Sequence, residues 1–287
     1  MKNLKYFLEF IIIFIFFFIF KILGYKTASN LGKLIGEIIG PKFRSKKIIT
    51  ENIRNFKPSI NNDEVNVLIK KMWGNYGRIL AEYPFIPNFR NKKLEKHLKI
   101  EGLNSLKKII KSGKPTLFIS GHFNNLELMA MIIEREGVDL AAVYRPLNNK
   151  FLNMIMEYLR KNYICRTQIK KGLKGVREAL TYFKRGKSLA IMIDQRVTEG
   201  IDVKLFGKNA FTTTIPAQFV KKFGCLIQPV YIERINSVNF KVVFDDHLDF
   251  NNDKNIENIT KKLNQWLEDK IIKNPDQWIW THDRWKH

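Results

Sequence analysis

From residue 116 onward, short apolar runs alternate with segments whose apolar residues have helical spacing. The runs are TLFIS (116–120), LAAVY (140–144), SLAIMID (188–194), CLIQPVYI (225–232) and FKVVF (240–244). Helical segments are expected near 125–135 and 151–161, within 171–186 and 216–224, and over 255–272. This alternation predicts an α/β fold with a mixed, largely parallel sheet flanked by helices.

The N-terminus carries an apolar stretch, YFLEFIIIFIFFFIFKILG, over residues 6–24. At about 1.5 Å per residue it is long enough to cross a ~30 Å hydrocarbon core, so we expect 1–24 to be a membrane anchor. Lys2 and Lys5 precede it, whereas Lys and Arg recur after it up to residue 47, which predicts a single pass with the remaining chain in the cytoplasm. A cleaved signal peptide and a helix lying in the plane of the interface are the alternatives.

The rest of the chain divides by pattern into two parts. Residues 25–111 have mostly helical spacing, and 112–287 carry the α/β alternation. The two cysteines, Cys165 and Cys225, lie far apart without metal-ligand neighbours, so we expect neither a disulfide framework nor a metal site. No glycine-rich nucleotide-binding loop is present, and we expect no cofactor.

The net charge is +23, from 50 Lys and Arg against 27 Asp and Glu. Such an excess predicts a polyanionic partner: an anionic membrane surface, an acidic protein or a nucleic acid. A membrane-tethered binding protein without enzymatic activity is therefore one hypothesis. No aromatic-rich basic recognition motif supports nucleic acid, so we expect no nucleic-acid partner.

The segment SGHFNNLEL (120–128) carries the strongest candidate for chemistry. His122 and Glu127 are five residues apart, so they face different directions within one helix. They meet only if His122 lies in the turn that leaves the strand, where Gly121 permits a sharp bend and Asn124 or Asn125 caps the helix. Such a pair forms a general base, because the carboxylate orients the imidazole. The alternative is a capping-box variant that needs no function.

Other polar residues follow the remaining strands and are candidates for substrate binding. Tyr144 and Arg145 end one strand, and Asp194 and Gln195 end another. An Arg at a strand's carboxyl end clamps phosphate or carboxylate, although a salt bridge or a cap explains such residues equally well. Thr212, Thr213 and Thr214 precede a helix that begins with proline, where they act as caps or line an anion site.

Taken in order, the apolar N-terminus, GHFNNLE, VYRP, IDQ, LFGKNAFTTTIPA and NPDQWIWTHDRWK resemble the late acyltransferases of lipid A biosynthesis. His122 and Glu127 spell the H-x4-D/E motif of the wider acyltransferase superfamily. The chain departs from many relatives after Asp-Gln, where it has Arg196, Val197 and Thr198. The FPEGTR-type segment of the glycerolphosphate branch is absent.

The resemblance implies an inner-membrane enzyme whose catalytic part faces the cytoplasm. It implies acyl transfer from acyl carrier protein to a hydroxyl on an acyl chain of an anionic, Kdo-bearing lipid A precursor, in lipopolysaccharide biosynthesis. His122 is then the general base and Glu127 its partner, while Arg145, Asp194 and Thr212–Thr214 line the pocket. Another lipid acceptor, such as a lysophospholipid, an amino-lipid or a glycosylated phosphoinositide, is the nearest alternative.

Overall fold

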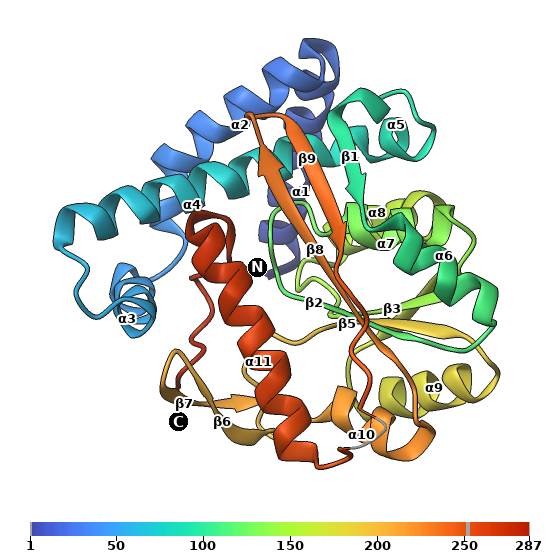
Figure 1. Ribbon diagram of the computed structural model, residues 1–287. Helices are drawn as coiled ribbons and strands as arrows, with labels where there is room; N and C mark the ends of the chain where they lie inside the picture. Colours follow the sequence, from blue (N-terminus) through green and yellow to red (C-terminus); the bar gives the residue numbers. More distant parts are fainter. Residues whose placement is uncertain (1, 251–252, 287) are drawn as a thin grey trace.

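A computed structural model describes residues 2–250 and 253–286 and confirms the α/β expectation. The strands are β1 (Leu98–Glu101), β2 (Leu117–Ser120), β3 (Leu140–Tyr144), β4 (Thr167–Lys170), β5 (Ser188–Met192), β6 (Ile201–Leu205), β7 (Lys208–Thr212), β8 (Ile227–Ile235) and β9 (Asn239–Phe244). Seven of them form a sheet in the order β1-β9-β8-β2-β5-β3-β4 (Figure 1). All neighbours in it are parallel except β8 and β9, which are antiparallel.

Helices surround this sheet, and the helices nearest the N-terminus of the chain extend beyond its edge (Figure 1). The helices are α1 (Lys2–Leu23), α2 (Tyr25–Ile39), α3 (Lys46–Phe56), α4 (Asn62–Glu82), α5 (Ile86–Arg90), α6 (Leu103–Ser112), α7 (Glu127–Arg135), α8 (Lys150–Leu159), α9 (Leu173–Lys184), α10 (Ile215–Phe223) and α11 (Ile256–Lys273). A 3-10 turn, η2 (Tyr83–Phe85), follows α4, and a π-helical turn, η4 (Arg160–Ile164), follows α8.

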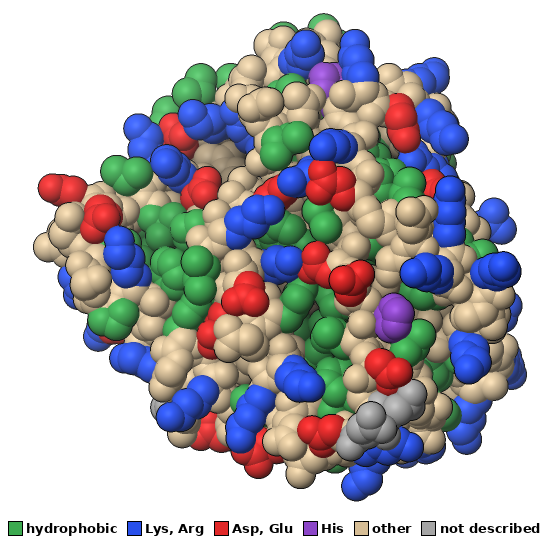
Figure 2. Space-filling view, in the orientation of Figure 1, with side chains coloured by type: hydrophobic (Ala, Val, Ile, Leu, Met, Phe, Trp, Pro, Cys, Tyr) green, Lys and Arg blue, Asp and Glu red, His purple; other side chains and the backbone are tan. Residues whose placement is uncertain are grey.

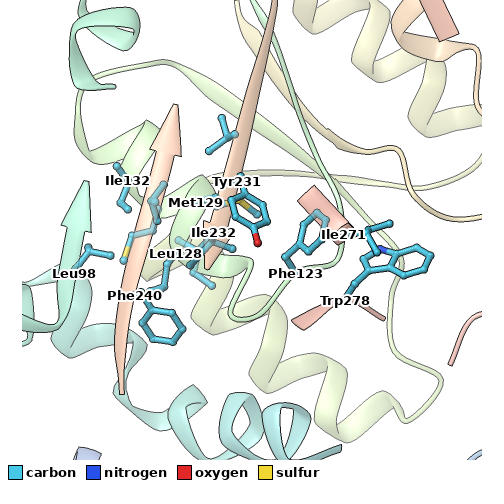
Figure 3. Packing of buried hydrophobic residues seen from close by; sticks show 14 of the residues in the cluster. Leu98, Phe123, Leu128, Met129, Ile132, Tyr231, Ile232, Phe240, Ile271 and Trp278 are labelled. Atoms are coloured by element: carbon cyan, nitrogen blue, oxygen red, sulfur yellow. The ribbon is translucent and has the colours of Figure 1, made fainter. Parts of the chain in front are cut away.

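Side chains from the central strands are buried on both faces of the sheet, which is why these strands read as continuous apolar runs. In β2, Leu117 and Ile119 pack with α9, α10 and the first half of α11, whereas Phe118 packs on the opposite side with α7. On that second side, Phe123 meets Tyr231 edge-on with ring centroids 4.9 Å apart, and Trp278 lies beside them (Figure 3).

Three parts of the fold were not expected from the sequence. β1 lies within the range read as mostly helical, and it pairs with β9 in the main sheet. β4 forms the far edge of that sheet. β6 and β7 form a separate antiparallel hairpin that ends at Thr212. These strands are short and partly exposed, so they lack the apolar runs that marked the others.

The N-terminal helix α1 is long and apolar enough to cross a membrane. It nevertheless lies against the rest of the protein instead of extending away from it (Figure 1). Gly24 follows it with φ 76°, and α2 then packs along α4. Gly32, Gly36 and Gly77 allow that approach, since a Cβ at any of them would meet the facing backbone within 2.4 Å.

Candidate active site

Two loops at the carboxyl ends of neighbouring strands bring His122 and Asp194 together. β2 ends at Ser120, β5 ends at Met192, and the two strands pair directly in the sheet. Each polar residue stands two positions beyond its strand, so equal distances along parallel strands place both at the same edge. The carboxyl edge of an open α/β sheet is the usual place for a ligand.

The contact between His122 and Asp194 is short and well defined. Nδ1 of His122 lies 2.7 Å from Oδ1 of Asp194, and the backbone N–H of His122 donates to Oδ2 at 2.7 Å. The indole N–H of Trp278 donates to the same Oδ2 at 2.8 Å. An ionised carboxylate only accepts, so Nδ1 carries the proton and Nε2 keeps its lone pair. Nε2 faces the side-chain amide of Gln195 at 3.4 Å.

The opposite charges of this pair favour the ionic forms, although burial opposes them. The Asp194 side chain is fully buried, whereas that of His122 is 27% exposed. Burial alone would lower the pKa of His122, but the Asp194 carboxylate outweighs burial and raises that pKa above 6.5. Burial likewise opposes ionisation of Asp194, yet the imidazole, the His122 N–H and the Trp278 indole hold its pKa below 3.8. The imidazole is therefore a stronger base than free histidine.

Glu127 does not hold the imidazole, which corrects the expected pairing. Its carboxylate accepts from Arg160 Nε at 2.9 Å and Nη2 at 2.5 Å, and from the Tyr83 hydroxyl at 2.8 Å. No hydrogen bond joins Glu127 to His122 in the described chain. Glu127 is close enough for its charge to raise the pKa of His122, while Arg160 lowers it. Asp194, and not Glu127, is the carboxylate that faces Nδ1 directly, and a catalytic role for Glu127 stays a prediction.

The turn between β2 and α7 is shaped differently from the expected helix cap. The residue before α7 is Leu126, and neither Asn124 nor Asn125 makes a capping bond there. Asn124 adopts a left-handed conformation with φ 40°, which turns its side chain toward Gln277. Little space remains at Gly121, since a Cβ there would come within 2.8 Å of Phe123 Cε2 and 3.0 Å of Leu267 Cδ1.

The C-terminal segment, whose NPDQWIWTHDRWK motif is part of the resemblance, completes the site. Phe123 and Trp278 form an antiparallel bridge, and the Asn124 N–H donates to the Gln277 carbonyl at 3.2 Å. Gln277 is fixed in turn by two bonds to the backbone of Arg234, at 2.9 and 3.1 Å. The paired tryptophans of WIWTHDRWK were the available signal, because such aromatic residues are usually buried.

A cavity of about 130 Å³ opens beside His122. Its lining consists of Asn75, Tyr76, Ile79, Tyr83, His122, the segment 124–127, Gln277 and Ile279. It is smaller than the ~300–1,000 Å³ that encloses a drug-sized ligand, so it accommodates reacting groups and not a whole lipid. The described residues contain no cluster of three or more His, Cys, Asp or Glu that would hold a metal ion.

A buried ion pair beneath the cavity fixes two of its lining residues. Glu82, which is fully buried, accepts from Arg234 at 2.6 and 3.0 Å. Arg234 also donates to Asn75, and Asn125 donates its amide to Glu82. Because the Glu82 carboxylate accepts only, the Asn125 amide group must face it, and Asn125 Oδ1 is left buried without a partner in the described chain.

Comparison with known proteins identifies the protein family. The whole chain, residues 1–287, matches the family described as bacterial lipid A biosynthesis acyltransferase. This chain belongs to that family. It is 22% identical over 272 residues to the lipid A biosynthesis palmitoleoyltransferase of Escherichia coli (strain K12), covering 92% of this chain and 86% of that protein. It is 23% identical over 271 residues to the lauroyltransferase of the same organism, covering 91% and 85%.

The other residues that were expected to bind substrate at the ends of strands do not line the cavity of this acyltransferase. The Tyr144 hydroxyl donates to Glu157 at 2.5 Å, and the guanidinium of Arg160 lies 5.4 Å from the centre of its ring. Arg145 is exposed. Gln195 alone of this group reaches His122. A substrate-binding role for Tyr144, Arg145 and Gln195 stays a prediction.

The three threonines have partners within the protein. Thr212 Oγ1 accepts from Arg284 at 2.7 Å and from Asn264 at 3.2 Å. The Thr213 hydroxyl accepts from the N–H of Ile215, and that of Thr214 accepts from Gln218. These hydrogen bonds connect the β6–β7 hairpin to the C-terminal segment and to α10. They explain the threonines as structural residues, and substrate binding by Thr212–Thr214 stays a prediction.

Arg160 and Tyr83 are the site residues that the sequence did not indicate. The side chains of Arg160 and its partner Glu127 are only 14% and 9% exposed. It lies in the π-helical turn after α8, where no periodic pattern marks it. Only an acidic partner elsewhere in the sequence could have indicated a buried arginine here, and the sequence pattern paired that partner, Glu127, with His122.

Proposed function

We propose that this acyltransferase moves an acyl chain from acyl carrier protein to a hydroxyl on an acyl chain of a Kdo-bearing lipid A precursor, with His122 as general base. The observation that supports the proposal most is the oriented His122–Asp194 pair beside a cavity in a lipid A acyltransferase fold. The proposal places the enzyme at the cytoplasmic face of the inner membrane, where both substrates meet.

In the proposed reaction, Nε2 of His122 takes the proton of the acceptor hydroxyl. The hydroxyl oxygen then attacks the thioester carbonyl, and Asp194 stabilises the imidazolium that forms. Backbone N–H groups at the start of α7 stabilise the oxyanion. The carbon–sulfur bond breaks, an ester forms, and the imidazolium returns its proton to the leaving thiolate. No metal or cofactor is required.

The charge of the protein suits both substrates. Figure 2 shows Lys and Arg side chains spread across one face, with Asp and Glu between them and no single basic patch. Acyl carrier protein is acidic, so a surface with net positive charge accelerates its encounter with the enzyme. The lipid A precursor is anionic and lies in a membrane surface that attracts the same charges.

An assay with purified enzyme tests the substrates directly. Acyl carrier proteins loaded with chains of several lengths are offered with a Kdo-bearing precursor, and the same chains are offered on coenzyme A. We expect transfer from the carrier protein, with one chain length preferred, and an ester on an existing acyl chain by mass spectrometry. Equal rates from coenzyme A would contradict the donor assignment.

The acceptor is tested separately in cells. Mass spectrometry of membrane lipids from a deletion strain is expected to show a lipid A species that lacks one secondary acyl chain. Loss of acylation on a lysophospholipid, an amino-lipid or a glycosylated phosphoinositide, with lipid A unchanged, would contradict the proposed acceptor.

Opposite pH shifts are expected when the two members of the Glu127–Arg160 pair are replaced singly. Glu127 raises the pKa of His122 and Arg160 lowers it, so Glu127→Gln shifts the acid limb of kcat/KM to lower pH and Arg160→Met shifts it upward. Each single change also leaves a buried group unpaired and destabilises the fold by about 3–5 kcal/mol.

The double variant Glu127→Gln/Arg160→Met is the matched control. It removes both charges, so we expect the acid limb near its wild-type position and part of the stability recovered. pH–rate profiles and thermal unfolding measure the two effects. If all three variants keep the wild-type pH profile, the pair supports the fold alone and has no influence on the base.

A further inference from the structure

We propose that α1 lies in the plane of the membrane, with one face in the lipid and the other on the protein, and does not cross the bilayer. The inference concerns how the protein binds the membrane, and it rests on the membrane association in the proposed function and not on acyl transfer. It replaces the single pass that the apolar sequence of α1 predicts by the in-plane arrangement, which the sequence left as an alternative.

The body of the protein contacts α1 from its first turns to its last. At the start, the Asn149 amide donates to the Tyr6 carbonyl at 2.8 Å and to the Glu9 carboxylate at 3.0 Å. At the end, Lys21 Nζ donates to Asn88 at 3.0 Å, and Phe20 is only 2% exposed. These contacts span about 22 Å of helix, at about 1.5 Å per residue.

The covered residues of α1 recur with helical spacing along its whole length. They include Tyr6, Glu9, Phe10, Ile13 and Phe16, which are half-buried, and Phe20, which is buried. The exposed large apolar residues of α1 are Leu4, Phe7, Leu8, Ile11, Ile12, Phe14, Ile15, Phe18, Ile19, Ile22 and Leu23. At about 100° per residue, this exposed set spans an arc of roughly 180°, centred on the side opposite the less exposed set. One side of α1 is thus apolar and free from end to end, and the other side is occupied by protein.

This arrangement conflicts with a helix that spans the bilayer. A spanning α1 would carry about 22 Å of the attached body into the hydrocarbon, including Asn149, Asn88 and the charged exposed surface beside them. Charged and polar groups in hydrocarbon are costly. A helix in the interface plane buries its outer face in lipid and keeps the body outside, with the exposed Lys2 and Lys5 near its start and the exposed Lys26 just beyond its end.

The cavity lies directly beside this helix. Phe17 of α1 stacks on Tyr83 with ring centroids 6.5 Å apart, and Tyr83 lines the cavity and donates to Glu127. One side chain therefore separates the lipid-bound helix from the site. In this orientation a lipid acceptor reaches His122 from the leaflet in which α1 lies, without leaving the membrane.

Depth measurements at three positions distinguish the two arrangements. Leu8→Cys, Ile15→Cys and Ile22→Cys each carry one nitroxide, on the full chain bound to vesicles that contain phosphatidylglycerol. The three positions are seven residues apart and share the exposed face, with exposed fractions of 54%, 52% and 70%. The native thiols of Cys165 and Cys225 do not compete for the label, because burial raises the pKa of both to about 12.

We expect the three probes to report one depth within a few Å, a short way below the headgroups. A spanning helix would separate neighbouring probes by about 10 Å, with Ile15 near the bilayer centre. That pattern, or three probes in water, would overturn the proposal. A nitroxide on Lys108→Cys, on the exposed side of α6, is the control that stays in water.

Labelling in cells tests the same point independently of depth. An impermeant maleimide is applied to spheroplasts and to inverted membrane vesicles that contain Lys5→Cys or Lys108→Cys. We expect both cysteines to react from the same side, since α1 never crosses. Reaction from opposite sides would overturn the inference while leaving the acyl-transfer assay unaffected, so the two proposals fail separately.

Discussion

Asp194→Asn is expected to reduce kcat/KM by about 10³–10⁴-fold, the loss that follows when a buried acid no longer holds a catalytic histidine in its basic tautomer. Oδ2 of Asp194 accepts from the His122 N–H and from Trp278, so the new amide group cannot take that position without opposing two donors. It faces Nδ1 instead and donates to it. The proton of His122 then moves to Nε2, which can no longer accept one.

The pH profile provides a second test of this substitution. Asp194 is the main influence that raises the pKa of His122, while burial of the imidazole persists in the variant. The acid limb of kcat/KM, which follows the raised pKa of His122 in the wild type, is therefore expected to move to lower pH in Asp194→Asn. A near-normal rate, or an unmoved acid limb with normal thermal stability, would exclude Asp194 as the orienting acid.

The position of His122 followed from local pattern, but the identity of its partner did not. The apolar run before Gly121 and the helix after it placed His122 in a turn at a strand's end, as observed. The partner depends on strand order. β2 and β5 are neighbours in the sheet although His122 and Asp194 are 72 residues apart in sequence, and no local pattern reports that pairing.

The local environments that the sequence did not reveal share a physical reason. Thr212 ends β7 and Asp194 lies two residues beyond β5, yet Thr212 closes a hairpin that no apolar pattern indicated and is held there by Arg284. Asn124 was read as a cap because Asn suits helix starts, but the same residue also tolerates the left-handed conformation it adopts here. Each residue type fits two local structures, and long-range contacts with the C-terminal segment decide between them.

His122→Ala is expected to abolish measurable acyl transfer, because it removes the group that accepts the hydroxyl proton, a contribution of about 10²–10⁴-fold for general-base catalysis alone. The substitution also deprives the buried Asp194 of the Nδ1 donor, although the backbone N–H and the Trp278 indole remain. We therefore also expect a loss of folding stability at neutral pH, because one fewer hydrogen bond compensates for the burial of that carboxylate.

His122→Gln separates the chemical loss from the structural one. The glutamine amide can donate to Asp194 in place of Nδ1 but offers no basic nitrogen, so this variant should unfold nearer the wild-type temperature and remain equally inactive. Both variants should bind vesicles as the wild type does, because α1 is untouched. Acylation near the wild-type rate in the folded glutamine variant would show that His122 is not the base, and the proton would then have to leave by another route beside the same cavity.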